Sequence, residues 1–412
     1  MKSTKEVNEV KGLIQEQAHA AWTGLGRQGT IAAGTGFGKS RLAVMEVQRL
    51  FDAGELTGVD VLCVSPTEKL RDDNWPKEFE DWGAKHIFDK HVEAICFASL
   101  AKYQNKKRWK LVILDEIHRL TDLSATAFKS TGHDTFTEFM ANILADAVMG
   151  LTATVPDPKR DPDKARIIAQ IAPVIFTYTL DEGVADGMIA DYEIRVVETY
   201  LDDTKKVIKA GTKTKPFMTT EAKHYEYLEK NIRKQRMLAA NASGAQVARF
   251  EKLAMFATMA RNRFLYNLPS KTELAARCLE QITGTKRTIV FCGSIDQCNT
   301  LLGDQVYHSK SGNDAYNRFN KKEISVLGVV NAANEGINFV DLDQALVIQV
   351  DSNQRNLVQR VGRTLRLREG HKSIVYILCV QGTADERWLA KSLEGFDKSK
   401  ITYYSAKSVP VG

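Results

Sequence analysis

Short apolar runs alternate with amphipathic stretches along most of the 412 residues. In the first half, such runs occupy residues 30–33, 59–65, 92–97, 111–114, 148–151 and 174–178. A run without polar alternation is typical of a strand that is buried on both faces, and such strands belong to parallel sheets covered by helices. The alternation therefore predicts an α/β fold with a parallel sheet flanked by helices.

The second half repeats this pattern, with strand-like runs at 194–197, 288–291, 326–330, 345–350 and 374–380. A chain of this length suits two domains of about 200 residues each. We place the boundary near Gly187, which gives domains 1–187 and 188–412. A basic, mostly helical segment at about 200–282 forms an insertion early in the second domain.

Composition excludes several classes of protein. The six cysteines form no CxxC pair, so the sequence argues against structural zinc and for reduced thiols. No run of about 18 apolar residues is present, and the first residues lack an apolar signal, so we expect a cytoplasmic protein without membrane contact. The net charge of +6 permits a polyanionic partner without requiring one.

A glycine-rich turn follows the apolar run 30–33 and precedes a helical stretch. Glycines let the backbone bend so that its amides face phosphate oxygens, and Lys39 would then reach the terminal phosphates while Ser40 coordinates magnesium. The strict phosphate-loop pattern has glycine at position 33, where this chain has Ala33. An ordinary glycine-rich turn is the alternative. The other expected nucleotide contacts in the turn are Gly34, Thr35, Gly36 and Gly38.

An acidic pair, Asp115 and Glu116, follows the apolar run 111–114. Ligands of open α/β sheets bind at the carboxyl ends of the strands, where these carboxylates would lie. Asp115 would hold magnesium and Glu116 would orient and deprotonate the attacking water. Acidic residues after a strand are also common in turns. His118 is positioned to hydrogen-bond toward segment 152–154, although a lone histidine is by default solvated.

Two arginines near the C-terminus, Arg363 and Arg366, are three residues apart and would share one face of a helix. Two guanidinium forks on one face can read phosphate. The alternative is a helix whose arginines pair with acids or solvent.

These segments, in this order, resemble the motifs of superfamily 2 helicases of the DExH type. Gln15 resembles the glutamine that reads adenine. The other matching segments are 34–40, 65–67 with Leu70, 97–100, 115–118, 152–154, 290–294, 334–338 and 359–366. They extend over nearly the whole chain. The narrower likeness is to compact phage-encoded branch-migration helicases, which would place the protein in a host cytoplasm.

The resemblance implies two RecA-like domains that bind ATP and Mg²⁺ between them. Gln359, Arg363 and Arg366 would act from the second domain on a nucleotide held by the first. Gly336 and Asn338 would also contact the nucleotide, with Asn338 in place of a frequent aspartate.

The resemblance also implies a nucleic-acid track with contacts to phosphate and sugar, so that binding is independent of sequence. DNA is favoured over RNA, because the DEIH and GIN sequences are closer to those of DNA translocases. A monomer is expected, and a protein partner stays open. The alternatives are an RNA helicase, a nucleotide-gated clamp and a motor subunit of a restriction or repair complex. The residues implied for the track are Pro66, Thr67, Ser99, Ser294 and Asn331.

Two basic stretches, 205–215 and 233–236, could widen this track. A run of charges is equally well explained as a solvated face.

Overall fold

The computed structural model describes residues 4–34, 36–119, 142–159, 161–188, 190–212, 214–284, 286–330, 339, 342–350, 372–394 and 396–408. The chain divides into two compact units, the first formed mainly by Met1–Asp191 and the second beginning at Tyr192. Within the described residues, no helix combines the length and the apolar character needed to cross a bilayer.

The first unit contains a six-stranded parallel sheet with the strand order β3-β2-β4-β5-β1-β6. The six apolar runs of the first half form these strands, which confirms the predicted parallel architecture. Their bounds are β1 Gln28–Ala33, β2 Val61–Ser65, β3 Val92–Cys96, β4 Leu111–Asp115, β5 Val148–Thr152 and β6 Val174–Tyr178.

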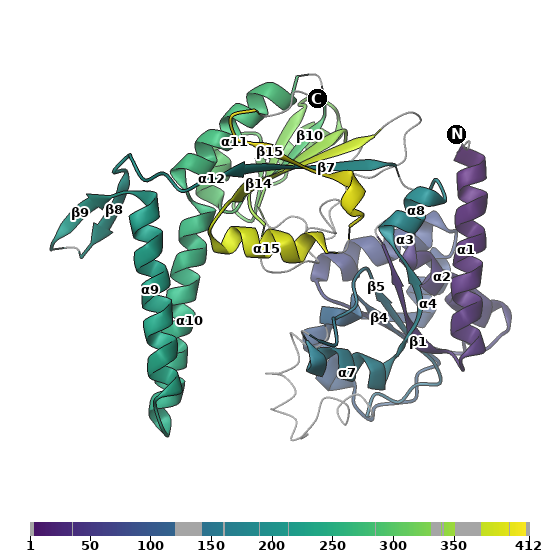
Figure 1. The fold of residues 1–412 in the computed structure, drawn as a ribbon. Coiled ribbons are helices and arrows are strands. Elements are labelled where there is room, and N and C mark those ends of the chain that lie inside the picture. Colours follow the sequence, from purple (N-terminus) through teal and green to yellow (C-terminus); the bar gives the residue numbers. More distant parts are fainter. Residues whose placement is uncertain are drawn as a thin grey trace. The chain divides into compact units, whose positions relative to one another are not determined.

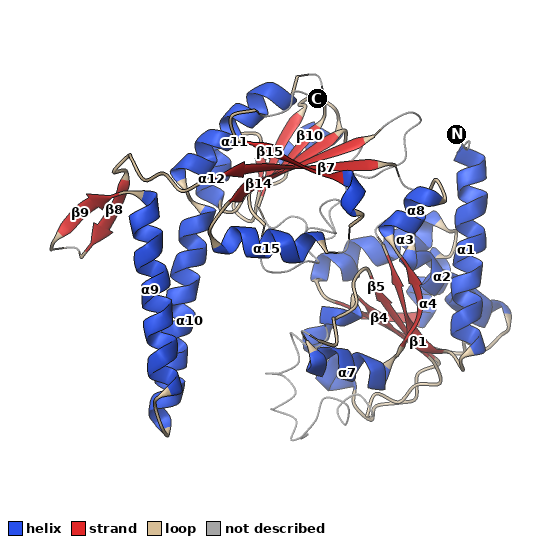
Figure 2. Ribbon diagram, viewed as in Figure 1, coloured by secondary structure: helices blue, strands red, loops and turns tan. Residues whose placement is uncertain are grey.

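Helices flank this sheet (Figure 2). Their bounds are α1 Thr4–Gly24, α2 Lys39–Asp52, α3 Trp75–Asp81, α4 Lys85–His91, α7 Pro162–Ile171 and α8 Leu180–Ala185. A π-helical turn at Leu70–Asn74 changes directly into the α-helix α3. Pro76 explains the change, because it has no N–H to donate to an α-helical partner four residues earlier.

The second unit contains a seven-stranded parallel sheet with the order β11-β12-β10-β13-β14-β7-β15. The five predicted runs all form strands, and two edge strands, β11 and β15, were not predicted. The bounds are β7 Tyr192–Thr199, β10 Thr288–Phe291, β11 Val306–Tyr307, β12 Val326–Val329, β13 Gln344–Val347, β14 Ser373–Val380 and β15 Ile401–Ser405. Helices α11 Pro269–Ile282, α12 Ile295–Leu302, α13 Asp314–Asn320 and α15 Ala384–Leu393 complete this unit.

The insertion of the second unit is only partly helical. Strands β8 Ile208–Gly211 and β9 Pro216–Thr219 form an antiparallel ribbon at the start of the segment predicted to be mostly helical, and this ribbon was not predicted. Helix α9 Glu221–Ala240 and helix α10 Ala245–Tyr266 follow, side by side (Figure 1). The backbone of Gly211 is left-handed, with φ of 90°, and Pro216 cannot donate a helical hydrogen bond, so both residues favour the ribbon.

Candidate nucleotide-binding site

The loop between β1 and α2 is held in a conformation that requires glycine. Gly38 has a φ of 80°, and a Cβ atom at this position would lie 2.7 Å from Nε2 of Gln15. Gln15, which lies on α1, donates from Nε2 to the carbonyl oxygens of Phe37 (2.8 Å) and Gly38 (3.2 Å). The side-chain amide of Gln15 therefore fixes the loop, while its adenine-reading role stays a prediction.

Lys39 is the first residue of α2, and its side chain turns back toward the end of β1. Its Nζ atom donates to the carbonyl oxygen of Ala33 at 2.8 Å. Burial lowers the pKa of Lys39, and the nearby charges of Glu116 and Asp115 oppose this shift. The ammonium group is thus held close to two carboxylates, at the loop expected to receive phosphates.

Asp115 is the last residue of β4. Burial and then the charge of Glu116 raise its pKa, whereas Lys39 and a side-chain hydrogen bond from Trp75 lower it. Trp75, a buried residue of α3, was not among the predicted site residues. No local pattern connects Trp75 to an acidic residue forty positions later, so only the folded chain reveals this contact.

Glu116 combines backbone strain with an unsatisfied oxygen. Its φ of 49° lies in the left-handed region, which costs a residue other than glycine about 1 kcal/mol or more. In the described part of the chain, its buried Oε2 atom accepts no hydrogen bond, although Nδ1 of His118 lies 3.3 Å away. Strained residues and unsatisfied buried oxygens cluster at active sites, where a ligand or water completes the contacts.

His118 is buried and not solvated, with 3% of its surface exposed. Its Nδ1 atom lies 2.7 Å from Oγ1 of Thr152, the last residue of β5, which confirms the expected contact with segment 152–154. The Thr152 hydroxyl donates its proton to the carbonyl oxygen of Thr154 at 2.8 Å. In the contact with His118 the hydroxyl oxygen therefore accepts, and Nδ1 of His118 is the protonated nitrogen that donates. The proposed relay through this contact stays a prediction.

The remaining predicted residues of the first unit lie in loops or at helix starts. Ser40 is the second residue of α2, and a Cβ on Gly34 would lie 3.4 Å from Leu180. Thr67 accepts a hydrogen bond from the Leu70 amide at 3.3 Å, after β2. Pro66 lies next to Thr67 in the same loop. Gly36 has a left-handed backbone with a φ of 92°. Ser99 lies in the 3-10 helix Phe97–Tyr103, which follows β3.

In the second unit, Ser294 is the N-cap of α12. Its hydroxyl accepts from the Gln297 amide at 3.1 Å and donates to Oδ1 of Asn267 at 2.5 Å. These bonds engage the hydroxyl locally, and its contact with nucleic acid stays a prediction. Seven predicted residues lie outside the described residues: Thr35, Asn331, Gly336, Asn338, Gln359, Arg363 and Arg366.

The strand order explains why the described residues gather. Strands β4, β5 and β1 are neighbours and parallel, so Asp115, Thr152 and the Lys39 loop follow carboxyl ends at one edge of the sheet. This set suits a nucleotide with Mg²⁺: Lys39 offers a cation, and the crowded pair Asp115 and Glu116 offers anionic oxygens. No larger cluster of metal ligands occurs among the described residues, and Mg²⁺ bound with a nucleotide needs only one or two carboxylates.

Two family models match the chain. Residues 12–157 match the type III restriction enzyme res subunit, and residues 270–368 match the helicase conserved C-terminal domain. The first match contains Gln15, Lys39, Asp115, Glu116 and His118.

Two curated relatives are similar to this chain. The DNA 3'-5' translocase XPB2 of Sulfurisphaera tokodaii is 24% identical over 394 residues, covering 90% of this chain and 82% of that protein. The probable ATP-dependent RNA helicase DDX47 of Homo sapiens is 25% identical over 186 residues, covering 44% of this chain and 40% of that protein.

Two solved structures show the same fold. The type ISP restriction-modification enzyme LlaBIII bound to DNA has a TM-score of 0.56 and 14% identity over 98% of this chain, which spans 31% of that enzyme. Dbp5 of S. cerevisiae bound to RNA and ADP BeF3 has a TM-score of 0.55 and 11% identity, and the match covers 98% of this chain and 94% of that chain. Each unit is accordingly a RecA-like domain. Together, these matches indicate that the protein is an ATP-hydrolysing helicase of superfamily 2.

Proposed function

We propose that this protein is a DExH-type DNA helicase or translocase, which couples ATP hydrolysis to movement on duplex, forked or branched DNA and acts as a monomer. The observation that carries the proposal is the grouping of Lys39, Asp115 and Glu116 at the carboxyl edge of the first sheet. A partly buried cation beside two carboxylates, at the end of a glycine-dependent loop, suits a triphosphate and its metal.

Each residue of this site has a distinct proposed task. Lys39 and the loop amides hold the terminal phosphates, and Ser40 and Asp115 hold Mg²⁺. Bound Mg²⁺ would neutralise phosphate charge during transfer. Glu116 orients a water molecule and accepts its proton, because its Oε2 atom is buried and accepts no hydrogen bond in the described part of the chain. His118 orients Glu116 from the Thr152 side.

The second domain completes this chemistry in our proposal. Domain 1–187 would hold the nucleotide, and domain 188–412 would supply Gln359, Arg363 and Arg366. A guanidinium group supplied in this way stabilises the charge of the transition state, so hydrolysis would require closure of the two domains.

DNA is the preferred substrate in this proposal. The similarity to the DNA translocase XPB2 covers 90% of this chain, whereas that to the RNA helicase DDX47 covers 44%. The type III restriction enzyme match supports the same choice. Contacts from Pro66, Thr67, Ser99, Ser294 and Asn331 would go to phosphate and sugar and would be independent of sequence.

ATP hydrolysis should therefore be stimulated by DNA. We expect an increase of about tenfold, because coupling between two ligand sites is typically 1–3 kcal/mol. Steady-state phosphate release would be measured with single-stranded, duplex, forked and four-way DNA, and with RNA of matched length. The Lys39→Ala variant is the control and should show no stimulated turnover. Strong stimulation by RNA with none by any DNA would replace this proposal with an RNA helicase.

A further inference from the structure

The positive charge of this protein is concentrated in the insertion of the second unit. Residues 201–266 contain 14 lysines and arginines and 6 acidic residues, a net charge of +8, which exceeds the +6 of the whole chain. The rest of the chain is therefore slightly acidic. If charge were spread evenly over the chain, the insertion would not carry more net charge than the whole protein. The insertion therefore differs from the rest of the chain in the sign of its net charge.

The insertion is built as a projecting arm. Helices α9 and α10 pack against each other through buried residues that include Leu228, Ile232 and Ala257. Within its unit, the pair extends away from the seven-stranded sheet (Figure 1). The 22 residues of α10 correspond to about 33 Å at 1.5 Å per residue.

The base of the arm is fixed to its unit by buried polar contacts. Tyr225 accepts from the backbone amide of Ala384 at 2.8 Å, and it donates to Glu229 at 3.0 Å. Arg261 of α10 donates to the same Glu229 at 2.8 Å. The Ala384–Tyr225 hydrogen bond joins the base of α9 to its unit, and the charged Arg261–Glu229 contact holds α10 against α9 in a fixed geometry.

The outward faces of both helices carry cations without acidic partners. On α10, Arg249, Lys252 and Arg263 are exposed and follow one face by helical spacing, together with Phe256. On α9, Lys223 and Lys234 share the outward face with Tyr227, which is 64% exposed. Among the described residues, these five cations form no ion pair. A merely solvated helix face usually mixes both signs in i,i+4 pairs, and α9 carries one such exposed pair, Glu226 with Lys230 at 2.7 Å. The α10 face presents cations of one sign, so this face suits an anionic partner.

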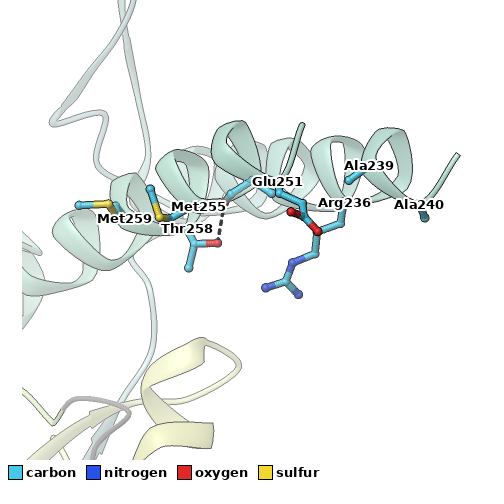
Figure 3. A pocket seen from close by; sticks show the side chains of 8 residues that line it. Arg236, Ala239, Ala240, Glu251, Met255, Thr258 and Met259 are labelled. Atoms are coloured by element: carbon cyan, nitrogen blue, oxygen red, sulfur yellow. Dashed lines mark hydrogen bonds between the residues drawn. The ribbon is translucent and has the colours of Figure 1, made fainter. Parts of the chain in front are cut away.

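A pocket between the helices is the second feature of the arm. It has a volume of about 540 Å³ and is lined by Met255 and Met259 of α10 and by Arg236 and Ala239 of α9 (Figure 3). A pocket of this size suits side chains of a protein and not a nucleic-acid duplex. None of the five cations on the outward faces lines this pocket. Glu251 is the one acidic residue in its lining, so the pocket and the cationic faces are separate features of the arm.

We infer that the β8–β9 ribbon and the α9–α10 hairpin form an accessory arm that binds the phosphate backbone of duplex nucleic acid. The row from Arg249 to Arg263 spans about 21 Å, which matches roughly six base pairs at a rise of 3.4 Å. A straight, convex helix can lie along a duplex, whereas single strands are usually bound in a groove with stacked aromatic side chains. This binding needs no nucleotide, so it is independent of the proposed motor activity.

The test removes the cations and measures the salt dependence of duplex binding. The variant changes six exposed residues to glutamine, which keeps helix propensity: Lys223, Arg233, Lys234, Arg249, Lys252 and Arg263. The control changes six exposed lysines outside the arm to glutamine, with the same loss of charge: Lys90, Lys106, Lys310, Lys321, Lys398 and Lys407. Fluorescence anisotropy with a labelled 30-base-pair duplex, without nucleotide, gives Kd at several salt concentrations.

We expect the arm variant to bind the duplex at least about tenfold more weakly. The slope of log K against log salt should fall by about 3, because the α10 row supplies three phosphate contacts and each lost contact reduces the slope by about 0.9. The control should keep the wild-type slope, and ATP hydrolysis without nucleic acid should be unchanged in both variants. Wild-type affinity and slope in the arm variant would overturn the inference. Equal losses in the control variant would also overturn it, because net charge alone would then explain the effect.

Discussion

Replacing Glu116 with glutamine is expected to slow ATP hydrolysis by about 10²–10⁴-fold, the usual contribution of a general base. Glutamine keeps the size of the side chain but cannot accept the proton of the attacking water. ATP binding should be retained, because Lys39 and the loop after β1 are unchanged. Single-turnover hydrolysis measures the chemical step, and equilibrium binding of a fluorescent ATP analogue measures affinity separately.

The matched control for this variant is Glu80→Gln, which alters an exposed carboxylate of α3 in the same unit. It should hydrolyse ATP at the wild-type rate. Wild-type turnover in Glu116→Gln would show that Glu116 is not the base. Loss of ATP binding in that variant would instead assign Glu116 to the nucleotide pocket.

Replacing Arg363 with alanine is expected to reduce turnover by about 10³-fold or more, the range known for arginine fingers. This expectation rests on the sequence, because Arg363 lies outside the described residues. Its guanidinium group would contact the nucleotide mainly in the closed transition state, so ATP affinity should change little. Stopped-flow binding and single-turnover hydrolysis distinguish the two effects.

Arg166→Ala is a suitable control for the loss of an arginine. Arg166 is exposed on α7 and pairs with Asp163 at 3.4 Å, a surface contact worth about 0–1 kcal/mol. It should leave both affinity and turnover unchanged. If Arg363→Ala turned over ATP like the wild-type protein, Arg363 would not be a finger.

The sequence predicted the central strands of both sheets well, for a physical reason. Strands such as β2 and β10 are buried along their whole length, so their sequences are continuously apolar. Edge strands lack that pattern: β11 has two residues, and β15 (ITYYS) has no fully buried residue. The ribbon before α9 was not predicted, because neither of its strands has a buried residue and their sequences are not continuously apolar.

The candidate site was predictable where a short motif sets the local geometry. The turn before Lys39 and the acids after β4 follow strands that could be recognised, so their place at the sheet edge followed from topology. The sequence did not predict two contacts of the site. One is the hydrogen bond from Trp75 to Asp115, and the other is the pair of hydrogen bonds from Gln15 to the loop before α2. Both contacts join residues far apart in sequence, and only packing of α1 and α3 brings them together.

The distribution of charge gives information that total charge does not. A net charge of +6 was weak evidence for a polyanionic partner. The stretches 205–215 and 233–236 fitted equally well with a solvated face. The folded hairpin changes this balance, because it places Arg249, Lys252 and Arg263 on one exposed face of α10 with no acidic partner among the described residues.

The most direct test of a nucleic-acid motor is the number of ATP molecules hydrolysed per binding event on DNA of increasing length. Pre-bound protein would be mixed with ATP and a trap that captures dissociated protein, and phosphate release would be followed in time. A motor that moves along DNA should release more phosphate per event on longer tracks, until dissociation sets a limit. Phosphate release that is independent of length, or not stimulated by DNA, would contradict translocation on DNA.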